Sequence, residues 1–299
     1  MVFKSGYITI LGRPNVGKST LMNAMIGSKI AAVTEKPQTT RNRCMGILSE
    51  TDYQIIFLDT PGVFEPDDNF NKILVKNAEM SIADADVLYV MTEADRAKNV
   101  LNPQTIRMME KTEAPKFLII NKVDKVKIPF NYKDDFKGEI DEGVFDEIIE
   151  ISALKNYNLD KILSTTLKYL SEGPQFYHPD NLSDKDMRFL VQEIVREKIM
   201  RLTGEEVPYC AAVVTEDYKE RENSKDYASC NIFVEHDSQK GILIGKSGSL
   251  LKKIGQESRT DIERLIGKEV YLELWVKVRK NWRKDEASLK EFGYMEKDY

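Results

Sequence analysis

The sequence is poor in the residues that build disulfide frameworks and soft metal sites. Its 299 residues include three cysteines and two histidines. Cys44, Cys210 and Cys230 lie far apart, and an odd number of widely spaced cysteines favours a reducing compartment over an oxidised, secreted framework. A tetrahedral zinc site needs more thiol or imidazole ligands than this chain offers. The sequence therefore argues against a disulfide-stapled domain and against a zinc protein.

Long hydrophobic runs are also missing. Runs such as Ile55–Leu58 and Phe117–Ile120 fall far short of the ~20 residues that span a bilayer. The start, Met1–Gly6, has no apolar stretch of signal-peptide length. Neither sign of charge dominates, because 44 Lys and Arg stand against 49 Asp and Glu, a formal net charge of −5. We expect a cytoplasmic protein of two domains, at roughly 150 residues per domain.

The first 170 residues alternate short apolar runs with helical patterns. This alternation is typical of a mostly parallel sheet with crossover helices. One helix is predicted over Lys18–Ile26, ended by Gly27, and another after Leu159. The predicted strands are Tyr7–Leu11, Tyr53–Leu58, Val87–Met91, Lys116–Ile120 and Ile148–Ile151.

The pattern changes at Gly173–Ser183, where prolines, glycine and polar residues predict a linker. We therefore divide the chain into residues 1–172, a linker at 173–183 and a smaller α+β unit at 184–299 that includes a C-terminal tail. Its elements are expected in the order α, β, β, α, α, β, at Asp186–Thr203, Tyr209–Thr215, Ser229–Glu235, around Gly241–Gly248, at Ser249–Ile266 and at Val270–Val278. Residues 240–284 contain twelve basic and five acidic residues, so this net-acidic chain carries a basic patch.

Residues 12–19 match the pattern GxxxxGK followed by Ser or Thr. They come directly after a predicted strand and open a predicted helix, where backbone N–H groups and the helix N-terminus favour a polyphosphate. Lys18 is expected to bridge the β- and γ-phosphates, and Ser19 to ligate Mg²⁺. The residues predicted to bind nucleotide here are Gly12, Arg13, Pro14, Asn15, Val16, Gly17, Lys18, Ser19 and Thr20.

Two further motifs follow predicted strands. Asp59-Thr60-Pro61-Gly62 fits DxxG, in which the carboxylate holds Mg²⁺ through water and the glycine N–H approaches the γ-phosphate. Asn121-Lys122-Val123-Asp124 fits NKxD, in which Asp124 accepts hydrogen bonds from the ring N–H and exocyclic amine of guanine. Adenine lacks that ring N–H, and each unpaired polar group costs about 1–3 kcal/mol. The sequence therefore predicts selection of guanine.

Other residues are expected to complete this base site. Lys122 would lay its aliphatic stem over the purine, and Asn121 would tie loops together and touch the base. Ser152, Ala153 and Leu154 follow another predicted strand, where a backbone N–H can reach guanine O6.

The four motifs occur in the order typical of GTPases, and residues 1–172 resemble the Ras-like GTPases of the translation-factor class. The resemblance implies that residues 28–44 form the effector loop and that Thr40, or alternatively Thr39, ligates Mg²⁺ together with Ser19 and Asp59. It implies catalytic roles for Lys18, Thr40 and Gly62.

One departure concerns the residue after Gly62. Ras-type enzymes place a water-positioning glutamine there, and this chain has Val63, so we expect slow intrinsic hydrolysis supported by charge stabilisation. Arg41 or Arg43 could assist, although a solvated loop arginine is the simpler interpretation.

The C-terminal unit has a motif of its own, Gly245-Lys246-Ser247-Gly248. A GxxG alone is common, but here it lies between predicted helices and precedes a basic helix, and the unit resembles a type II KH domain. KH domains use this loop to bring backbone close to the phosphates of single-stranded RNA. The resemblance implies RNA binding by Ile244, Gly245, Lys246, Ser247, Gly248, Lys252 and Lys253.

Nearly the whole chain resembles the Era family of bacterial GTPases. Segments that carry the likeness include Arg196–Leu202, Glu206–Tyr209 and Tyr271–Val278. The resemblance implies an α/β P-loop GTPase domain followed by a KH domain, with GTP or GDP and Mg²⁺ as cofactors. It implies binding to the 3′ end of small-subunit ribosomal RNA, a role in small ribosomal subunit maturation, peripheral association with the inner face of the cell membrane, and a monomer.

Two alternative functions each account for part of the sequence. A membrane-surface regulator would use the basic stretch Lys277–Lys284, where each basic residue contributes ~1 kcal/mol toward anionic headgroups. A nucleotide-consuming metabolic enzyme is the weakest alternative, because no acid, base or nucleophile constellation for a second substrate is apparent.

Overall fold

The computed structural model describes residues 2–63, 69–96, 100–126 and 130–295. Its contacts divide the chain into two compact units. The first consists of residues 1–30 and 40–184, and the second of residues 31–39 and 185–299. The predicted boundaries differ from this division in two places, because residues 31–39 group with the second unit and residues 173–184 with the first.

A six-stranded sheet forms the centre of the first unit, in the order β2-β3-β1-β4-β5-β6. All neighbouring strands are parallel except β2, which runs antiparallel to β3. The mostly parallel sheet of the prediction is therefore confirmed. The strands are β1 (Lys4–Gly12), β2 (Cys44–Ser49), β3 (Tyr53–Asp59), β4 (Val87–Glu93), β5 (Lys116–Asn121) and β6 (Glu147–Glu150).

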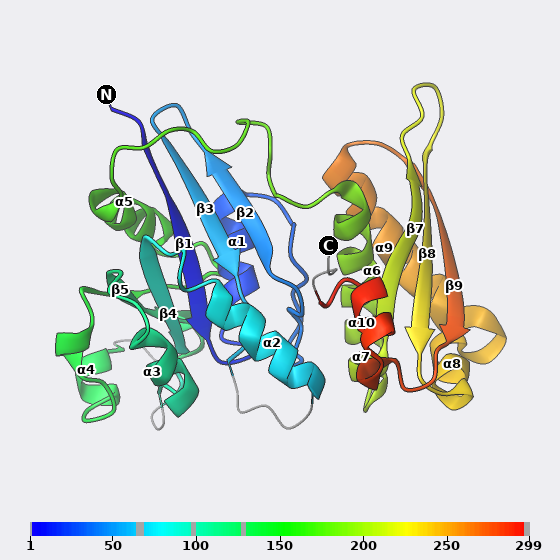
Figure 1. Ribbon diagram of the computed structural model, residues 1–299, viewed down its shortest axis with the longest axis horizontal. Coiled ribbons are helices and arrows are strands. Elements are labelled where there is room, and N and C mark those ends of the chain that lie inside the picture. The colour runs from blue at the N-terminus through cyan, green and yellow to red at the C-terminus, as the bar shows by residue number, and fades with distance from the viewer. Residues whose placement is uncertain (1, 64–68, 97–99, 127–129, 296–299) are drawn as a thin grey trace. The chain divides into compact units, whose positions relative to one another are not determined.

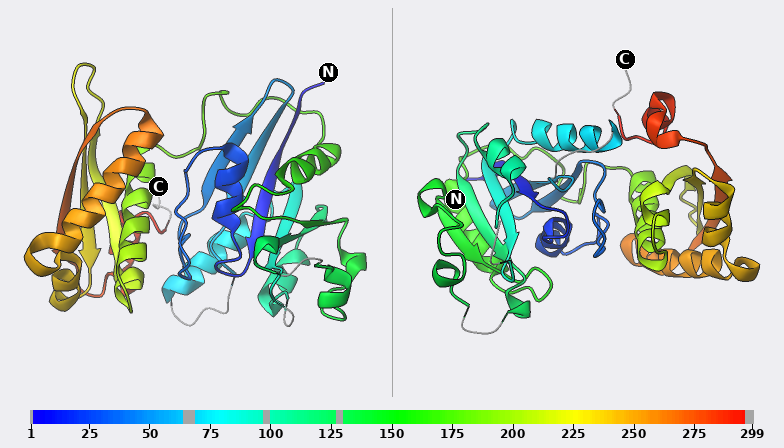
Figure 2. Two further views of the ribbon diagram at one scale, coloured as in Figure 1. Left: turned by 180° about the vertical axis from the view of Figure 1, so that it is seen from behind. Right: turned by 90° about the horizontal axis from the view of Figure 1, so that it is seen from below.

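Helices cover both faces of this sheet (Figures 1 and 2), with α2 and α3 on one face and α1 and α5 on the other. Successive side chains of β4 point to opposite faces of the sheet, and both faces are covered. Leu88 and Val90 pack in a buried cluster with residues of α2 and α3, whereas the Tyr89 hydroxyl lies 2.5 Å from the Thr166 hydroxyl of α5. The helices are α1 (Lys18–Ile26), α2 (Asn69–Met80), α3 (Pro103–Met109), α4 (Tyr132–Asp135) and α5 (Leu159–Tyr169).

Strand β2 was not predicted, and the predicted linker lies against it. The Ile47 N–H donates to the Leu182 carbonyl at 2.9 Å, and the Ser183 hydroxyl donates to the Met45 carbonyl at 2.7 Å. These bonds satisfy backbone groups of β2, which is an edge strand of the sheet. Residues 173–183 are thus a fixed strap on the first unit.

Gln54 of β3 clamps the middle of this strap. Its amide oxygen accepts from the N–H groups of Phe176 and Tyr177 at 2.8 and 2.9 Å, and its amide nitrogen donates to the Tyr177 carbonyl and the Ser49 hydroxyl, both at 2.9 Å. Gln54 is fully buried, so one side chain satisfies four polar groups that would otherwise compete for water.

The second unit is built on a three-stranded sheet in the order β7-β8-β9, with β9 parallel to β8 and β7 antiparallel to it. Its strands are β7 (Ala212–Lys219), β8 (Asp226–Val234) and β9 (Val270–Val278), and its helices are α6 (Met187–Leu202), α7 (Val207–Cys210), α8 (Asp237–Ile244), α9 (Ser249–Ile266) and α10 (Glu286–Glu291). Tyr209, predicted in a strand, lies in α7 instead. Pro208 occupies an early helical position, where its missing N–H costs nothing.

Two sets of apolar side chains hold the second unit together. Leu243 of α8 and Ile254 and Ile262 of α9 are completely buried in one cluster with residues of α6 and all three strands. The C-terminal segment is fixed separately, because the buried Trp282 indole donates to the Cys210 carbonyl at 2.8 Å and its ring packs at 5.4 Å from Phe292.

Replacing Gln54 should loosen the attachment of residues 173–183 to the first unit. In Gln54→Ala the N–H groups of Phe176 and Tyr177 lose their acceptor, and the first unit should be destabilised by about 1–3 kcal/mol. We expect faster chymotrypsin cleavage at Phe176 and Tyr177 and an earlier urea transition. Glu172→Ala, which removes an exposed side chain just before the strap, should change neither the cleavage rate nor the urea transition. Equal cleavage rates in the two variants would contradict the clamp.

Candidate functional site

The loop between β1 and α1 is shaped by residues that need unusual backbone angles. Asn15 has φ 67° and Gly17 has φ 101°, both in the left-handed region. Gly17 also lacks room for a side chain, because a Cβ there would lie 2.3 Å from the Asn121 amide nitrogen. The predicted α1 starts at Lys18 and ends at Ile26, before Gly27. This geometry presents the loop's backbone and the helix N-terminus to one region.

Lys18 is folded back over this loop. Its ammonium donates to the carbonyl groups of Gly12 at 3.1 Å and Arg13 at 3.0 Å, and the residue is only 5% exposed. Burial lowers the Lys18 pKa to about 8, partly opposed by the Asp59 carboxylate. Such a buried cation suits an anionic ligand, because a nearby phosphate would favour the charged form of the lysine.

Three oxygen-bearing side chains from separate elements meet beside Lys18. The Ser19 hydroxyl donates to the Asp59 carboxylate at 2.6 Å, the Thr40 hydroxyl donates to the same oxygen at 3.1 Å, and the two hydroxyls lie 2.9 Å apart. Hydroxyl and carboxylate oxygens are the ligands that Mg²⁺ prefers. The set therefore fits the metal that the sequence predicted there.

Thr39, the alternative for this role, points elsewhere. Its hydroxyl donates to the Lys36 carbonyl at 2.7 Å and lies 2.6 Å from the Thr34 hydroxyl. The structure thus brings Thr40, and not Thr39, to Ser19 and Asp59.

The segment after β3 rests on the phosphate loop. A Cβ on Gly62 would lie 2.7 Å from the Pro14 backbone nitrogen, and the Val63 N–H donates to the Gly12 carbonyl at 3.0 Å. The Val63 side chain is completely buried with Leu11 and Val90. It therefore lies in the core, where it cannot orient an attacking water. Residues 64–68 lie outside the described part of the chain.

The loop after β5 is tied to the phosphate loop by two side chains. The Asn121 amide donates to the Val16 carbonyl at 2.8 Å, and the Lys122 ammonium donates to the Asn15 carbonyl at 2.7 Å. Lys122 itself has a left-handed φ of 66°. The predicted role of Asn121 in joining loops matches these contacts, which also include an acceptor bond from the Ala153 N–H at 3.0 Å.

Asp124 and the segment after β6 lie together. The Ser152 hydroxyl donates to one Asp124 carboxylate oxygen at 2.5 Å, which orients an otherwise exposed carboxylate. Ser152 and Ala153 are buried, whereas Leu154 is 70% exposed. Residues from four loops thus surround one site, in the places where the sequence motifs predicted nucleotide contacts.

The two arginines of the effector loop differ in their exposure to solvent. Arg41 is completely buried, and its guanidinium lies 5.6 Å from the ring centroid of Phe70 in α2. Arg43 approaches the Asp84 carboxylate at 3.4 Å. The interpretation of Arg41 as a solvated loop residue was wrong, because its cation packs against an aromatic face.

The loop Gly245–Gly248 of the second unit also depends on left-handed backbone. Gly245, Ser247 and Gly248 have φ values of 72°, 52° and 78°. A Cβ on Gly245 would lie 2.8 Å from the Leu250 Cβ, so this position has no room for another residue. The loop therefore places compact backbone at the N-terminus of α9, as the predicted phosphate contact requires.

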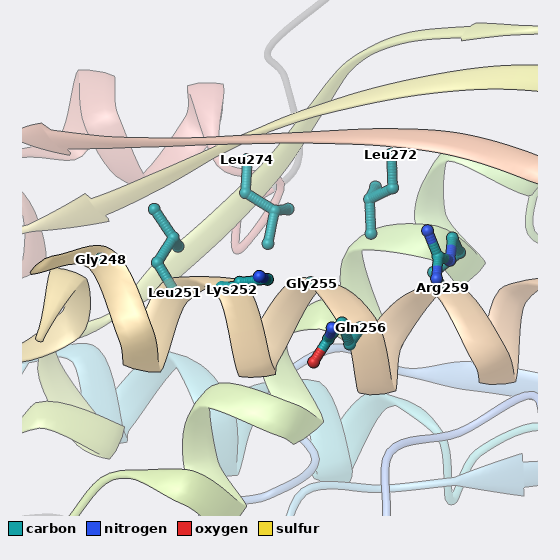
Figure 3. A pocket seen from close by; sticks show the side chains of 8 residues that line it. All are labelled: Gly248, Leu251, Lys252, Gly255, Gln256, Arg259, Leu272 and Leu274. Carbon is teal, nitrogen blue, oxygen red and sulfur yellow. The ribbon is translucent and has the colours of Figure 1, made fainter.

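An open cavity of about 460 Å³, which we call the groove, lies beside this loop between α9 and β9 (Figure 3). Leucine side chains from both elements face each other across it, and basic side chains of α9 lie along its length. Of the predicted RNA-binding residues, Gly248 and Lys252 line it, whereas Ile244, Gly245, Lys246, Ser247 and Lys253 do not. The lining residues are Gly248, Leu251, Lys252, Gly255, Gln256, Arg259, Leu272 and Leu274.

Six lining residues were missed from the sequence. Leu251, Gly255, Gln256 and Arg259 recur at helical spacing on α9, and Leu272 and Leu274 alternate on β9. The helical spacing on α9 and the alternation on β9 are both apparent in the sequence. They predict core packing, because the spacing of side chains does not show whether a face contacts a core or lines a groove.

Comparison with known proteins agrees with this arrangement. Residues 7–122 match a family model described as a 50S ribosome-binding GTPase, and residues 206–283 match a KH domain. A crystal structure of Era in complex with MgGDPNP and nucleotides 1506–1542 of 16S ribosomal RNA is 39% identical, with a TM-score of 0.90 over 98% of this chain and 99% of that one.

A second structure is similar over the same extent. Aquifex aeolicus Era, as a tyrosine-to-alanine variant bound to GDP·AlF4⁻, is 38% identical with a TM-score of 0.89, over 98% of this chain and 99% of that one. A phosphate loop, a guanine-reading motif and a KH groove occur here in one chain, and both relatives align along almost all of it. The chain belongs to the Era family of GTPases.

Proposed function

We propose that this protein is a GTP-dependent switch that binds single-stranded RNA at the 3′ end of small-subunit ribosomal RNA and assists maturation of the small ribosomal subunit. The observation that carries this proposal is the groove beside Gly245–Gly248, in a chain that also holds a phosphate loop at residues 12–19. The related Era that was crystallised with 16S ribosomal RNA nucleotides 1506–1542 supports this choice of RNA.

The groove suits an unpaired strand. Leu251, Leu272 and Leu274 offer apolar surface for bases, and Lys252 and Arg259 offer cations for phosphates. KH domains clamp about four nucleotides in this way. Gly255 lies between these groups, and its missing side chain leaves room for a base.

In the nucleotide site, Lys18 and the backbone of residues 12–19 would hold the β- and γ-phosphates. Ser19, Thr40 and Asp59 would hold Mg²⁺, which neutralises phosphate charge when bound. Gly62 would offer its N–H to the γ-phosphate. Because Val63 is buried, this chain supplies no side chain there to position water, and we expect slow intrinsic hydrolysis.

The protein would work in the cytoplasm. Its three cysteines are buried thiols, as in a reducing compartment. Within the described ranges, no helix combines the length and apolarity needed to traverse a bilayer. The basic stretch Lys277–Lys284 is a weak candidate for headgroups, since Arg279 pairs with Glu291 at 3.0 Å and Arg283 with Glu235 at 2.7 Å.

Filling the groove tests the RNA-binding proposal. In Gly255→Leu the new side chain would grow from helix α9 toward Leu274, which a Cβ already approaches at 3.5 Å, and occupy the space for a base. We expect at least about tenfold weaker binding of the 3′-terminal rRNA sequence in a fluorescence anisotropy titration. Gly241→Leu, on an open face of α8, is the matched control and should bind normally. Unchanged affinity of a Gly255→Leu protein with a normal melting curve would refute the groove assignment.

The buried lysine gives a pH test of phosphate binding. The Lys18 pKa is about 8 without ligand, and a bound polyphosphate would raise it by favouring the ammonium. GDP binding should therefore take up about half a proton at pH 8 and about a tenth at pH 7, and affinity should fall as pH rises above 8. Calorimetry in buffers of different ionisation enthalpy measures this uptake. Binding without proton uptake at pH 8 would contradict the role of Lys18.

Base selection depends on Asp124. In Asp124→Asn the acceptor for the guanine N–H groups becomes partly a donor, so preference should shift from GDP toward xanthosine diphosphate by at least about tenfold in a competition assay. Asp160→Asn, an exposed carboxylate on α5, should leave preference unchanged. Retained guanine preference in Asp124→Asn would show that another group reads the base.

A further inference from the structure

Glu93, the last residue of β4, lies among three cations beside the nucleotide site. One carboxylate oxygen accepts from the Lys122 ammonium, and the other lies 3.4 Å from the Arg96 guanidinium. Arg13 of the phosphate loop is close enough that Arg96 lowers its pKa, after the larger effect of burial, while Glu93 opposes this. The Glu93 side chain is 14% exposed and that of Lys122 is 22% exposed, so this ion pair is screened less than a pair on the open surface.

The sheet fixes the position of this carboxylate. Glu93 is paired with Asn121 in the parallel register of β4 and β5, and the next residue, Ala94, donates its N–H to the Asn121 carbonyl at 2.8 Å. The carboxyl ends of β4 and β5 therefore lie side by side at one edge of the sheet. This brings Glu93 next to Lys122, the first residue beyond β5.

Lys122 needs such a partner. Its ammonium is a point charge on a flexible four-carbon stem, and the stem must lie flat to cover a purine. The Asn15 carbonyl, at 2.7 Å, fixes it from the phosphate loop. A charge-assisted bond to a carboxylate is roughly twice as strong as a neutral one and fixes the ammonium from a second element. Arg96 in turn orients that carboxylate.

We propose that Glu93 is a positioning residue for guanine nucleotide binding, acting through Lys122. Its carboxylate holds the ammonium at the Asn15 carbonyl, so that the lysine stem is already ordered when the base arrives. Binding then loses less side-chain entropy. The inference rests on the proposed function, which assigns Lys122 to the purine face.

A double-mutant cycle tests this role. Glu93→Gln keeps the shape and removes the charge, and it should weaken GDP binding about three- to tenfold. The KM for GTP should rise by the same factor with kcat unchanged, because base contacts are the same in ground and transition states. In a Lys122→Met background, Glu93→Gln should have no further effect on GDP affinity.

Glu79→Gln is the matched control, since Glu79 pairs with Lys111 at 3.1 Å on the surface of the same unit. It should bind GDP normally. A Glu93→Gln effect that persists in the Lys122→Met background, or a fall in kcat, would overturn the positioning role. Normal GDP affinity in Lys122→Met itself would overturn the proposed nucleotide site and this inference with it.

Discussion

The nucleotide site depends on two hydrogen bonds between the loop after β5 and the loop after β1. Asn121 and Lys122 donate to the carbonyl groups of Val16 and Asn15, at 2.8 and 2.7 Å. Carbonyls that are held toward a neighbouring loop leave their peptide N–H groups facing the other way, which is how a nest for phosphate forms. Gly17 is required by the same contact, because a side chain there would collide with Asn121. Base recognition and phosphate binding therefore share one rigid frame.

Burial disfavours the positive charge of Lys18 in this frame, and an anionic ligand would favour it. Lys18 is buried with a pKa of about 8, and the Ser19 and Thr40 hydroxyls donate to the Asp59 carboxylate beside it. Lys18 and Asp59 are already desolvated in the folded protein, so this cost does not oppose binding a second time. A magnesium nucleotide would fit this site, because its phosphates would lie near the Lys18 ammonium and its metal near the oxygens of Ser19, Thr40 and Asp59. The ligand would in turn stabilise the fold by mass action.

Local features were predictable and tertiary ones were not. Helices α1 and α9 and strand β9 match the predicted bounds, because glycine or loop residues mark their ends. The nucleotide motifs were found because their chemistry is local to a strand end. The burial of Arg41, by contrast, depends on Phe70, some thirty residues away.

The strap and the RNA groove were hidden for a related reason. The bonds of Gln54 to the strap join residues more than 120 positions apart, and no local pattern in Gly173–Ser183 announces them. Leu272 and Leu274 show the same alternation whether a strand faces a core or an open groove. What the sequence lacked in each case was the identity of the packing partner.

The position of Thr40 explains how nucleotide could influence the second unit. Residues 31–39, which directly precede Thr40, belong by their contacts to that unit, where the Val33 N–H donates to Glu197 of α6 at 2.9 Å. On the other side, the Met45 N–H donates to the Asp184 carboxylate at 3.1 Å, one residue before the second unit begins. The two hydrogen bonds start seven residues before Thr40 and five residues after it. Allosteric coupling is typically worth 1–3 kcal/mol, and one hydrogen bond contributes about 0.5–1.5 kcal/mol. A nucleotide that repositions Thr40 would therefore act on two neighbouring segments, one held by contacts in the second unit and the other by contacts in the first.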